Sequence, residues 1–485
     1  MLITPQAERL GRSPTVSHAA KARNTAKSSK PSKRSGSAKT KAQAAQEPST
    51  ALAMAGRVLT SSLLALARVA GAGAGFVTQI VLARTLAASA LGLFYSVTSL
   101  AAVVGLIAAH GYPAIAPRFL ARYKSQGKRD LIAAFVARAR RDATFYVAIA
   151  TGLVLAGAWL WPTLMLEERL ALTAAALSIP ANASLRVNGS LAAATRRFAL
   201  AYLPDTCIRP FLLLGAILAL IASGIALTAS SATFALTIVF DGLALMQYSL
   251  LAKDMPKGKA PQAPQRLVSI WRSEAKPLIV VALFTYFFAD VDILMVTPLL
   301  PSAETAAVGL CLKLALLVGF AVQVAHQVVV PDLADARARK DHGPIRGVLA
   351  RALWFPLAVT IAATGFVALW GEHLLGVFGP EFVSAKIPLV IMMACQLART
   401  MFGPSVPLLT VIGAQRQNAG LAIAALMVLA LSNLVLAPLY GVLGAAIAVA
   451  IATLFWLTAS SIVLMRVSGL RTDALYLLSG SAVPA

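Results

Sequence analysis

Charged residues are scarce in this chain: they make up 13% of its 485 residues, whereas 58% are hydrophobic. A soluble protein is typically about a quarter charged. The charges also cluster between apolar runs of roughly 20 residues, and a helix of that length crosses a ~30 Å hydrocarbon core. Membrane-spanning strands would be about ten residues long with strict alternation of polar and apolar side chains, unlike these runs. The sequence therefore predicts an all-α polytopic membrane protein.

Acidic residues and cysteines are also few. The chain has 19 Asp and Glu against 43 Lys and Arg, a net charge of +24. Such an excess can mark nucleic-acid binding, but 11 of the basic residues lie in the first 57 positions and most others in loops on one predicted face. We therefore expect no nucleic-acid partner. Cys207, Cys311 and Cys395 lie inside apolar runs without metal-site or disulfide spacing, so we expect no metal and no cofactor.

The first 55 residues are of low complexity and rich in Lys, Ser and Ala. Such a segment buries too little apolar surface to fold alone, and it lacks the apolar core of a secretory signal. We predict a disordered basic cytoplasmic tail, which can rest on anionic lipid. An organellar transit peptide is the alternative.

Twelve predicted spans follow the tail, centred near residues 70, 103, 152, 179, 211, 237, 288, 318, 359, 397, 427 and 453. With the N-terminus in the cytoplasm, the inner loops carry 24 Lys and Arg residues and the outer loops three. This asymmetry agrees with the positive-inside rule, and one missed helix would invert every later loop. Both termini are therefore predicted to be cytoplasmic.

A basic, proline-rich stretch at 253–276 divides the spans into two equal sets. We predict an N-lobe over 56–252, a C-lobe over 277–468 and a C-terminal cytoplasmic tail over 469–485. Within the linker, LVSIWRSEAKP is expected to form a short interfacial helix with Trp271 at the headgroup level. Two halves joined by a linker are typical of secondary transporters, whose substrate site lies between the halves.

Five basic residues fall inside predicted spans: Arg68, Arg186, Arg209, Lys313 and Arg399. Each costs about 2.5 kcal/mol or more at the centre of a membrane helix, so each should face protein or water. On the first span Arg68 and Gln79 share a polar stripe with small residues, although the glycines of GAGAG (71–75) also favour close helix packing. On the eighth span Lys313 and Gln323 share a second stripe.

Acidic residues also occur inside the spans. Asp205 precedes Arg209 by one helical turn, so the two either neutralise each other or leave Arg209 free to bind substrate. Asp241 lies in the sixth span, where it pairs with another helix or faces a cavity mouth. The stretch FFADVDILMV (287–296) places Asp290 and Asp292 two residues apart.

The D-x-D pattern at 290–292 also occurs in glycosyltransferases that bind nucleotide sugars. Asp292 is predicted to lie ~22 Å along its helix, beyond mid-membrane and away from the cytoplasm. Two residues i and i+2 on a helix point in nearly opposite directions, so these carboxylates are not expected to chelate one ion. Asp292 is instead interpreted as an ion-coupling group or a gate-closing salt bridge, and Asp290 is expected to tolerate Asn better.

Four stretches resemble the polysaccharide and oligosaccharide (O-antigen-type) flippases of the multidrug/oligosaccharidyl-lipid/polysaccharide exporter superfamily. They are LLALARVAGAGAGFVTQIVLARTLAASALGLFYSVTSL (63–100), YFFADVDILMVTPLLPSAETAAVGLCLKLALLVGF (286–320), VFGPEFVSAKIPLVIM (377–392) and LAPLYGVLGAAIAVAIATLFW (436–456). Asp292 matches the family's acidic position, whereas Cys311 stands where the family usually has tyrosine. The last two helices of the fourteen-helix peptidoglycan-precursor flippases are not seen.

The resemblance implies a transporter of a bacterial inner membrane with two six-helix lobes around a central cavity. Alternating access would move a polyprenyl-pyrophosphate-linked glycan to the periplasmic leaflet, with H⁺ or Na⁺ coupling and polysaccharide-synthesis enzymes as candidate partners. The expected substrate-binding residues are Arg68, Gln79, Arg209, Lys313, Gln323 and Arg399, and the expected coupling or gating residues are Asp292, Asp241 and Asp205. A drug or cation antiporter of the same fold, a membrane enzyme and a scaffold for a glycan synthase are the alternatives. The outer loops are too short for a catalytic domain, which argues against an enzyme.

Overall fold

The computed structural model describes residues 66–253, 261–338, 343–469 and 471–474, without the side chains over most of 324–352. The predicted N-terminal tail therefore lies outside the described residues, as does most of the C-terminal tail. Within the described ranges every regular element is a helix. The prediction of an all-α chain is confirmed.

The first half comprises a helix at Leu66–Thr85, followed by α2 (Ala88–Ala108), α3 (Tyr112–Ser125), α4 (Arg129–Leu160), α5 (Leu166–Ala194), α6 (Phe198–Leu203), a π-helical turn (Pro204–Ile208), α7 (Arg209–Ala222) and α8 (Ala229–Ala252). The second half comprises α9 (Gln265–Tyr286), α10 (Phe288–Val296), α11 (Ser302–Ala338), α12 (Gly343–Gly376), a 3₁₀ turn (Pro380–Ala385), α13 (Lys386–Met401), α14 (Ser405–Val411) and α15 (Gln415–Ser468).

Ten helices in the described part are long and apolar enough to span a membrane, or eleven if the bent pair α9–α10 counts as one span. One of these, α15, has 54 residues and changes direction at Gly441, whose φ of 57° lies in the left-handed region. A left-handed residue interrupts a right-handed helix, so α15 supplies two spans. The twelve predicted spans are thereby accounted for.

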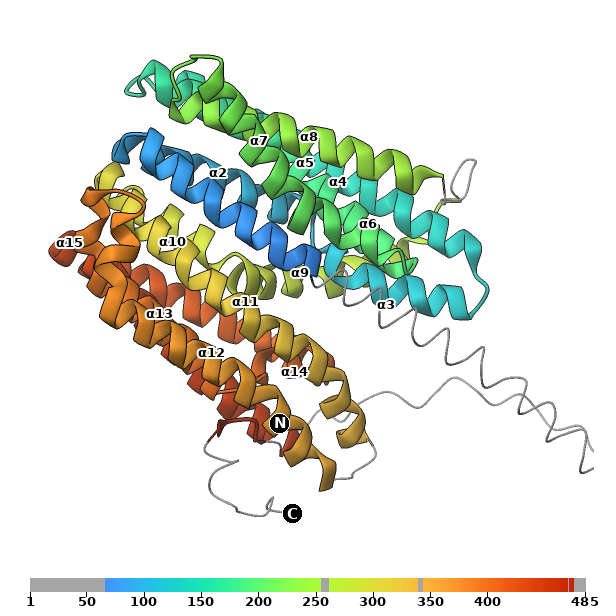
Figure 1. Cartoon of the computed structure of the whole chain (residues 1–485). Coiled ribbons are helices and arrows are strands. Elements are labelled where there is room, and N and C mark those ends of the chain that lie inside the picture. The colour runs from blue at the N-terminus through green and yellow to red at the C-terminus, as the bar shows by residue number, and fades with distance from the viewer. Residues whose placement is uncertain (1–65, 254–260, 339–342, 470, 475–485) are drawn as a thin grey trace, which may run out of the picture. The chain divides into compact units, whose positions relative to one another are not determined.

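The helices form two groups that follow the two halves of the sequence (Figure 1). The helices α4, α5, α7 and α8 lie on one side and α12, α13 and α15 on the other, while α2, α10 and α11 lie between them (Figure 1). The protein is thus a polytopic membrane protein of twelve transmembrane helices in two six-helix lobes around a central cavity.

The two halves touch directly at their predicted outer ends. A Cβ on Gly92 of α2 would overlap the carbonyl oxygen of Ser302 at the start of α11, so only glycine allows this approach. The hydroxyls of Ser96 and Thr297 lie 2.8 Å apart across the same contact. Arg84 donates hydrogen bonds to the carbonyls of Gly376 and Val377, 2.7 and 2.8 Å away at the end of α12. These contacts close the protein on the predicted outer side.

The first part of α9 packs on the N-lobe, although it follows the linker in sequence. Trp271 is fully buried there, donates its indole N–H to the hydroxyl of Tyr123 at 2.9 Å and meets the ring of Phe135 edge-on. Trp271 is thus a core residue of the first half, and LVSIWRSEAKP is part of the 22-residue helix α9 and not a separate short helix. A single Trp in a short amphipathic stretch resembles an interfacial anchor, and only the pocket formed by α3 and α4 shows that it is a core residue.

Candidate functional site

A cavity of about 1020 Å³ lies between the two halves. Its walls come from the helix at Leu66–Thr85, from α2, α3 and α5 to α8 of the first half, and from α9, α10, α11 and α14 of the second. The lining reaches Pro117, Ala193 and Thr410, near helix ends that are predicted to be cytoplasmic. Together with the closed outer contacts, this position makes the cavity inward-facing under the predicted topology.

The cavity wall is mostly apolar, with neutral polar and aromatic side chains set among the apolar ones. Tyr202 and Tyr286, which are 41% and 59% exposed, present large rings to the space. Further hydroxyl and amide groups line it: Thr78, Gln79, Thr98, Ser178, Asn182, Ser190, Gln247, Thr285 and Thr410. A wall of this composition offers hydrogen bonds and aromatic faces to a hydrophilic ligand.

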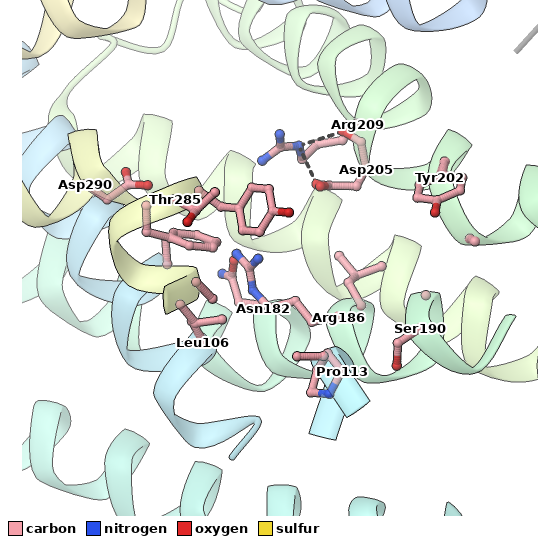
Figure 2. Close-up of a pocket in the computed structure, with 18 of the residues that line it drawn as sticks. Leu106, Pro113, Asn182, Arg186, Ser190, Tyr202, Asp205, Arg209, Thr285 and Asp290 are labelled. Atoms are coloured by element: carbon pink, nitrogen blue, oxygen red, sulfur yellow. Dashed lines mark hydrogen bonds and ion pairs between the residues drawn. The ribbon is translucent and has the colours of Figure 1, made fainter. Parts of the chain in front are cut away.

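Asp205 and Arg209 form an ion pair on one wall, with Arg209 Nε 3.2 Å from Asp205 Oδ1 (Figure 2). Asp205 lies in the π-helical turn Pro204–Ile208, and Arg209 begins α7. A π-turn changes the direction of side chains within a helix and is frequent at functional sites. Both predicted residues therefore line the cavity, and of the two alternatives for Asp205 and Arg209 the structure shows the ion pair.

Arg186 of α5 and Lys313 of α11 are the two cavity cations without an ion-pair partner among the described residues. The Arg186 guanidinium lies 4.1 Å from the ring centre of Phe287, and Lys313 Nζ lies 4.9 Å from that of Tyr95. Cation–π contacts supply part of the lost hydration but no counter-charge. The cavity thus presents two cations to whatever enters it.

Asp290 of α10 lines the cavity and accepts a hydrogen bond from the Ser99 hydroxyl at 2.9 Å. It attracts both Arg186 and Lys313 without forming a direct ion pair with either within the described ranges. Figure 2 shows Asp290 and Asp205 on opposite sides of Arg186. The five charged lining residues carry a net charge of +1.

Four of the predicted site residues meet in this cavity, namely Gln79, Asp205, Arg209 and Lys313. The amide oxygen of Gln79 accepts a hydrogen bond from the Tyr95 hydroxyl at 2.6 Å, while Lys313 lies over the ring of the same tyrosine. Arg68 lies behind the wall, 4.5 Å from the ring centre of the lining residue Tyr202.

The other predicted substrate-binding residues lie elsewhere. Gln323 is not among the lining residues, and Arg399 borders a separate small cavity in the second lobe. Asp241 is exposed on α8 and does not line the large cavity. A polar stripe predicts which side of a helix faces away from lipid. It does not predict which of several internal surfaces or cavities that side will face.

Asp292 is fully buried in the second lobe, outside the cavity. Its Oδ1 accepts a hydrogen bond from Nδ2 of Asn433 in α15 at 2.7 Å, and its Oδ2 has no partner among the described residues. The side-chain oxygen of Asn433 is likewise buried and unpartnered. No ion pair of Asp292 is found in the described part of the chain, so the predicted salt bridge is absent there. The expectation that Asp290 and Asp292 cannot share one ion agrees with their different surroundings.

Arg186 and Asp290 are the charged lining residues that were not selected as site residues from the sequence. Both were recognised as charges within spans. The sequence gives little indication that they line a cavity, because neither shares an obvious polar stripe with other residues of its own helix. Their role becomes visible only when α5, α10 and α11 are placed around one space.

No protein-family model matches this chain, and no curated protein matches it in sequence. Solved structures do match over most of its length. The inward closed conformation of lipid II flippase MurJ is 15% identical with a TM-score of 0.63, covering 83% of this chain and 87% of that one. An inward-facing MATE family multidrug transporter of the MOP superfamily is 13% identical with a TM-score of 0.59, covering 87% and 96%.

A third similar structure is the MATE multidrug transporter DinF-BH in complex with rhodamine 6G, which is 14% identical with a TM-score of 0.57 and covers 84% of this chain and 94% of that one. At such identities a shared fold is shown but a shared substrate is not. Both flippases and drug transporters occur among these structures. The chain therefore has the fold of the multidrug/oligosaccharidyl-lipid/polysaccharide exporter superfamily, as its sequence motifs predicted.

Proposed function

We propose that this protein flips a polyprenyl-pyrophosphate-linked oligosaccharide from the cytoplasmic to the periplasmic leaflet of a bacterial inner membrane, for surface polysaccharide biosynthesis. The observation that carries the proposal is the pair of cations, Arg186 and Lys313, which line a large cavity between the halves and have no ion-pair partner among the described residues. Arginine and lysine are the usual ligands of phosphate oxygens. A pyrophosphate would supply the counter-charge that these two side chains lack.

The rest of the wall suits the glycan. Its hydroxyl and amide groups can hydrogen-bond sugars, and Tyr202 and Tyr286 offer faces on which a sugar ring can stack. The cavity volume of about 1020 Å³ is at the upper end of the ~300–1,000 Å³ that is typical of ligand pockets. A headgroup fits such a space, whereas the polyprenyl chain is apolar and is stabilised by remaining in the bilayer.

Asp290 is proposed to regulate this cation pair. In the empty cavity its carboxylate partly balances Arg186 and Lys313, and an incoming pyrophosphate competes with it for them. Removing the Asp290 charge should therefore tighten anion binding and slow release. This role replaces the expectation that Asp290 is the more tolerant of the two aspartates.

Asp292 and Asn433 are proposed as the ion-coupling site. A carboxylate that is fully buried without a basic partner is stable only with a proton or a cation nearby. The unpartnered Asp292 Oδ2 and Asn433 Oδ1 are oxygen ligands that either ion could use. Because α10 contacts both α2 and α15, occupancy of this site can influence the contact between the halves.

The flippase proposal is tested by reconstituting the protein in liposomes with a fluorescent polyprenyl-pyrophosphate glycan and measuring its movement between leaflets. Arg186→Gln combined with Lys313→Gln should abolish movement and binding, whereas Arg186→Lys combined with Lys313→Arg should retain part of both. Arg471→Gln, at an exposed side chain outside the cavity, is the matched control. Normal movement with the double Gln variant would overturn the proposal.

A drug or cation antiporter is the second candidate, since the cavity also contains the carboxylates Asp205 and Asp290 and exposed tyrosines. The similar transporter DinF-BH was solved with rhodamine 6G. For an antiporter, the purified protein should bind rhodamine 6G, and Asp290→Asn should weaken that binding. For a flippase, the same substitution should strengthen binding of inorganic pyrophosphate. The opposite signs separate the two functions.

A further inference from the structure

A second, much smaller cavity lies inside the second lobe. It has a volume of about 20 Å³ and is enclosed by residues of α10, α11, α13 and α15. Most of the lining is apolar: Phe288, Ala289, Leu312, Ala315, Leu316, Met392 and Val449. The polar members are Cys395, Gln396, Arg399 and Thr453, and no carboxylate lines the space within the described ranges.

Arg399 has no ion-pair partner among the described residues of this lobe. Its guanidinium forms no ion pair and no hydrogen bond with the described residues, and it lies 6.0 Å from the centre of the Trp456 ring. Arg399 lies in the last turn of α13, where the helix end carries about half a negative charge. The remaining positive charge is uncompensated within a membrane-spanning helix, and such a group requires a partner.

The surroundings of Arg399 supply further polar groups. Gln396 is 7% exposed, and its side-chain oxygen has no hydrogen-bond partner in the described part of the chain. The indole nitrogen of Trp456 is also buried and unpartnered there. Buried polar atoms normally have partners. The Arg399 guanidinium and the indole N–H of Trp456, which does not itself line the small cavity, are donors that lack an acceptor among the described residues. The Gln396 oxygen is itself an acceptor and does not contribute to binding an anion.

We propose that this cavity binds a single small inorganic anion of halide size, such as chloride. A volume of about 20 Å³ holds one water-sized particle, which excludes phosphate, carboxylates of metabolites and any part of a lipid-linked substrate. A water molecule fits the space but leaves the Arg399 charge uncompensated. A halide fits the space and neutralises the guanidinium.

This site is separate from the substrate cavity. Cys311 of α11 lies against Ala385, just before α13, and Gly319 further along α11 lies against Gln396 of α13, so the two helices run side by side in the same direction. The small cavity lies between these two helices, inside the second lobe. Lys313, the cation that α11 presents to the large cavity, does not line the small one. The proposed anion therefore stabilises the packing of α11, α13 and α15 and does not depend on which substrate is carried.

The test uses the purified full-length protein in detergent, with thermal unfolding followed in increasing sodium chloride and in sodium gluconate of equal ionic strength. Chloride should raise the unfolding midpoint of the wild type in a saturable manner, and gluconate should not. The rise should vanish in Arg399→Met, in which an unbranched apolar stem is kept but the guanidinium and its charge are lost. It should persist in the control Arg471→Met. An equal chloride effect in wild type and Arg399→Met would overturn the proposal.

Crystals grown in sodium bromide give a second, direct measurement that does not require the variant to fold. Anomalous scattering should place one bromide beside the Arg399 guanidinium, inside the small cavity. A data set that shows only a water molecule there, or no peak at that place, would also overturn the proposal. Bromide in the large cavity beside Arg186 would concern the substrate site and would not count in its favour.

Discussion

Arg272 and Asp142 form a two-pronged contact, in which Nε of Arg272 lies 3.1 Å from Oδ2 of Asp142 and Nη2 lies 3.1 Å from Oδ1. The hydroxyl of Tyr112 donates a further hydrogen bond to Oδ2 at 2.7 Å. These bonds attach the first part of α9 to α3 and α4, whereas the later part of α9 meets the second lobe through Phe284 and Trp456, whose ring centres are 4.3 Å apart. One helix thus joins both lobes, with a bend of 79° between α9 and α10.

A double-mutant cycle should measure the coupling between Arg272 and Asp142. Arg272→Gln should lower the free energy of unfolding by about 1.5–3 kcal/mol, because hydrogen bonds to a charged group are lost. Asp142→Asn should cost a similar amount. The combined variant should cost less than the two together, by roughly 0.5–3 kcal/mol, since the residues are in contact. The measurement is chemical or thermal unfolding of the detergent-solubilised protein.

The control for this cycle combines Arg272→Gln with Asp205→Asn, a carboxylate that pairs with Arg209 instead. Their effects should add within about 0.5 kcal/mol. Simple additivity for Arg272 and Asp142 as well would show that the contact between α9 and α4 contributes no coupling energy.

Gly71 and Gly73 should respond differently to alanine. A Cβ on Gly71 would overlap the carbonyl oxygen of Thr206 in the π-helical turn, whereas a Cβ on Gly73 would meet nothing within 4 Å. Gly71→Ala should therefore force the two helices apart and lower stability by about 1–3 kcal/mol. Gly73→Ala should be neutral or stabilising by roughly 0.5–1 kcal/mol, the difference in helix propensity. Equal unfolding midpoints for the two variants would contradict the packing role of Gly71.

Arg84 should hold the outer side closed. Its guanidinium bonds the free carbonyls of Gly376 and Val377 at the end of α12 and so connects the two halves. In Arg84→Ala the halves should separate more often, and a cysteine placed at the buried Ser96 should react faster with a membrane-impermeant maleimide. Arg169, which bonds carbonyls of its own loop, provides the control variant Arg169→Ala. Unchanged labelling in Arg84→Ala would show that other contacts are sufficient for closure.

Asp292 should determine the response to an ion gradient. Asp292→Asn removes the titratable group but keeps the size of the side chain. The substrate should therefore still move between the leaflets, but an imposed H⁺ or Na⁺ gradient should no longer change the rate of transport. The exchanged variant Asp292→Asn with Asn433→Asp keeps one carboxylate and one amide in the same buried pair, and gradient dependence should return. The matched comparison is Asp290→Asn, which should change substrate affinity instead. Unaltered gradient dependence in Asp292→Asn would remove Asp292 from the coupling site.

The number and order of the membrane-spanning helices could be predicted from the sequence, because hydropathy and segment length are local properties. The sequence also predicted that Asp290 and Asp292 face different surroundings, since successive residues on a helix turn by about 100°. The pairing of Asp205 with Arg209 is one of the two alternatives that the sequence left open, because the two residues are one helical turn apart. Each of these features depends on a single helix.

The tertiary structure alone decided which internal surface each buried charge meets. Arg186, Lys313 and Arg399 are all cations within predicted spans, yet two line the large cavity and the third lies beside the small one. Likewise, Trp271 is a core residue because α3 and α4 surround it. A helix sequence determines which side chains share a face, whereas the groups against that face come from residues far away in the chain, and only helix packing brings them together.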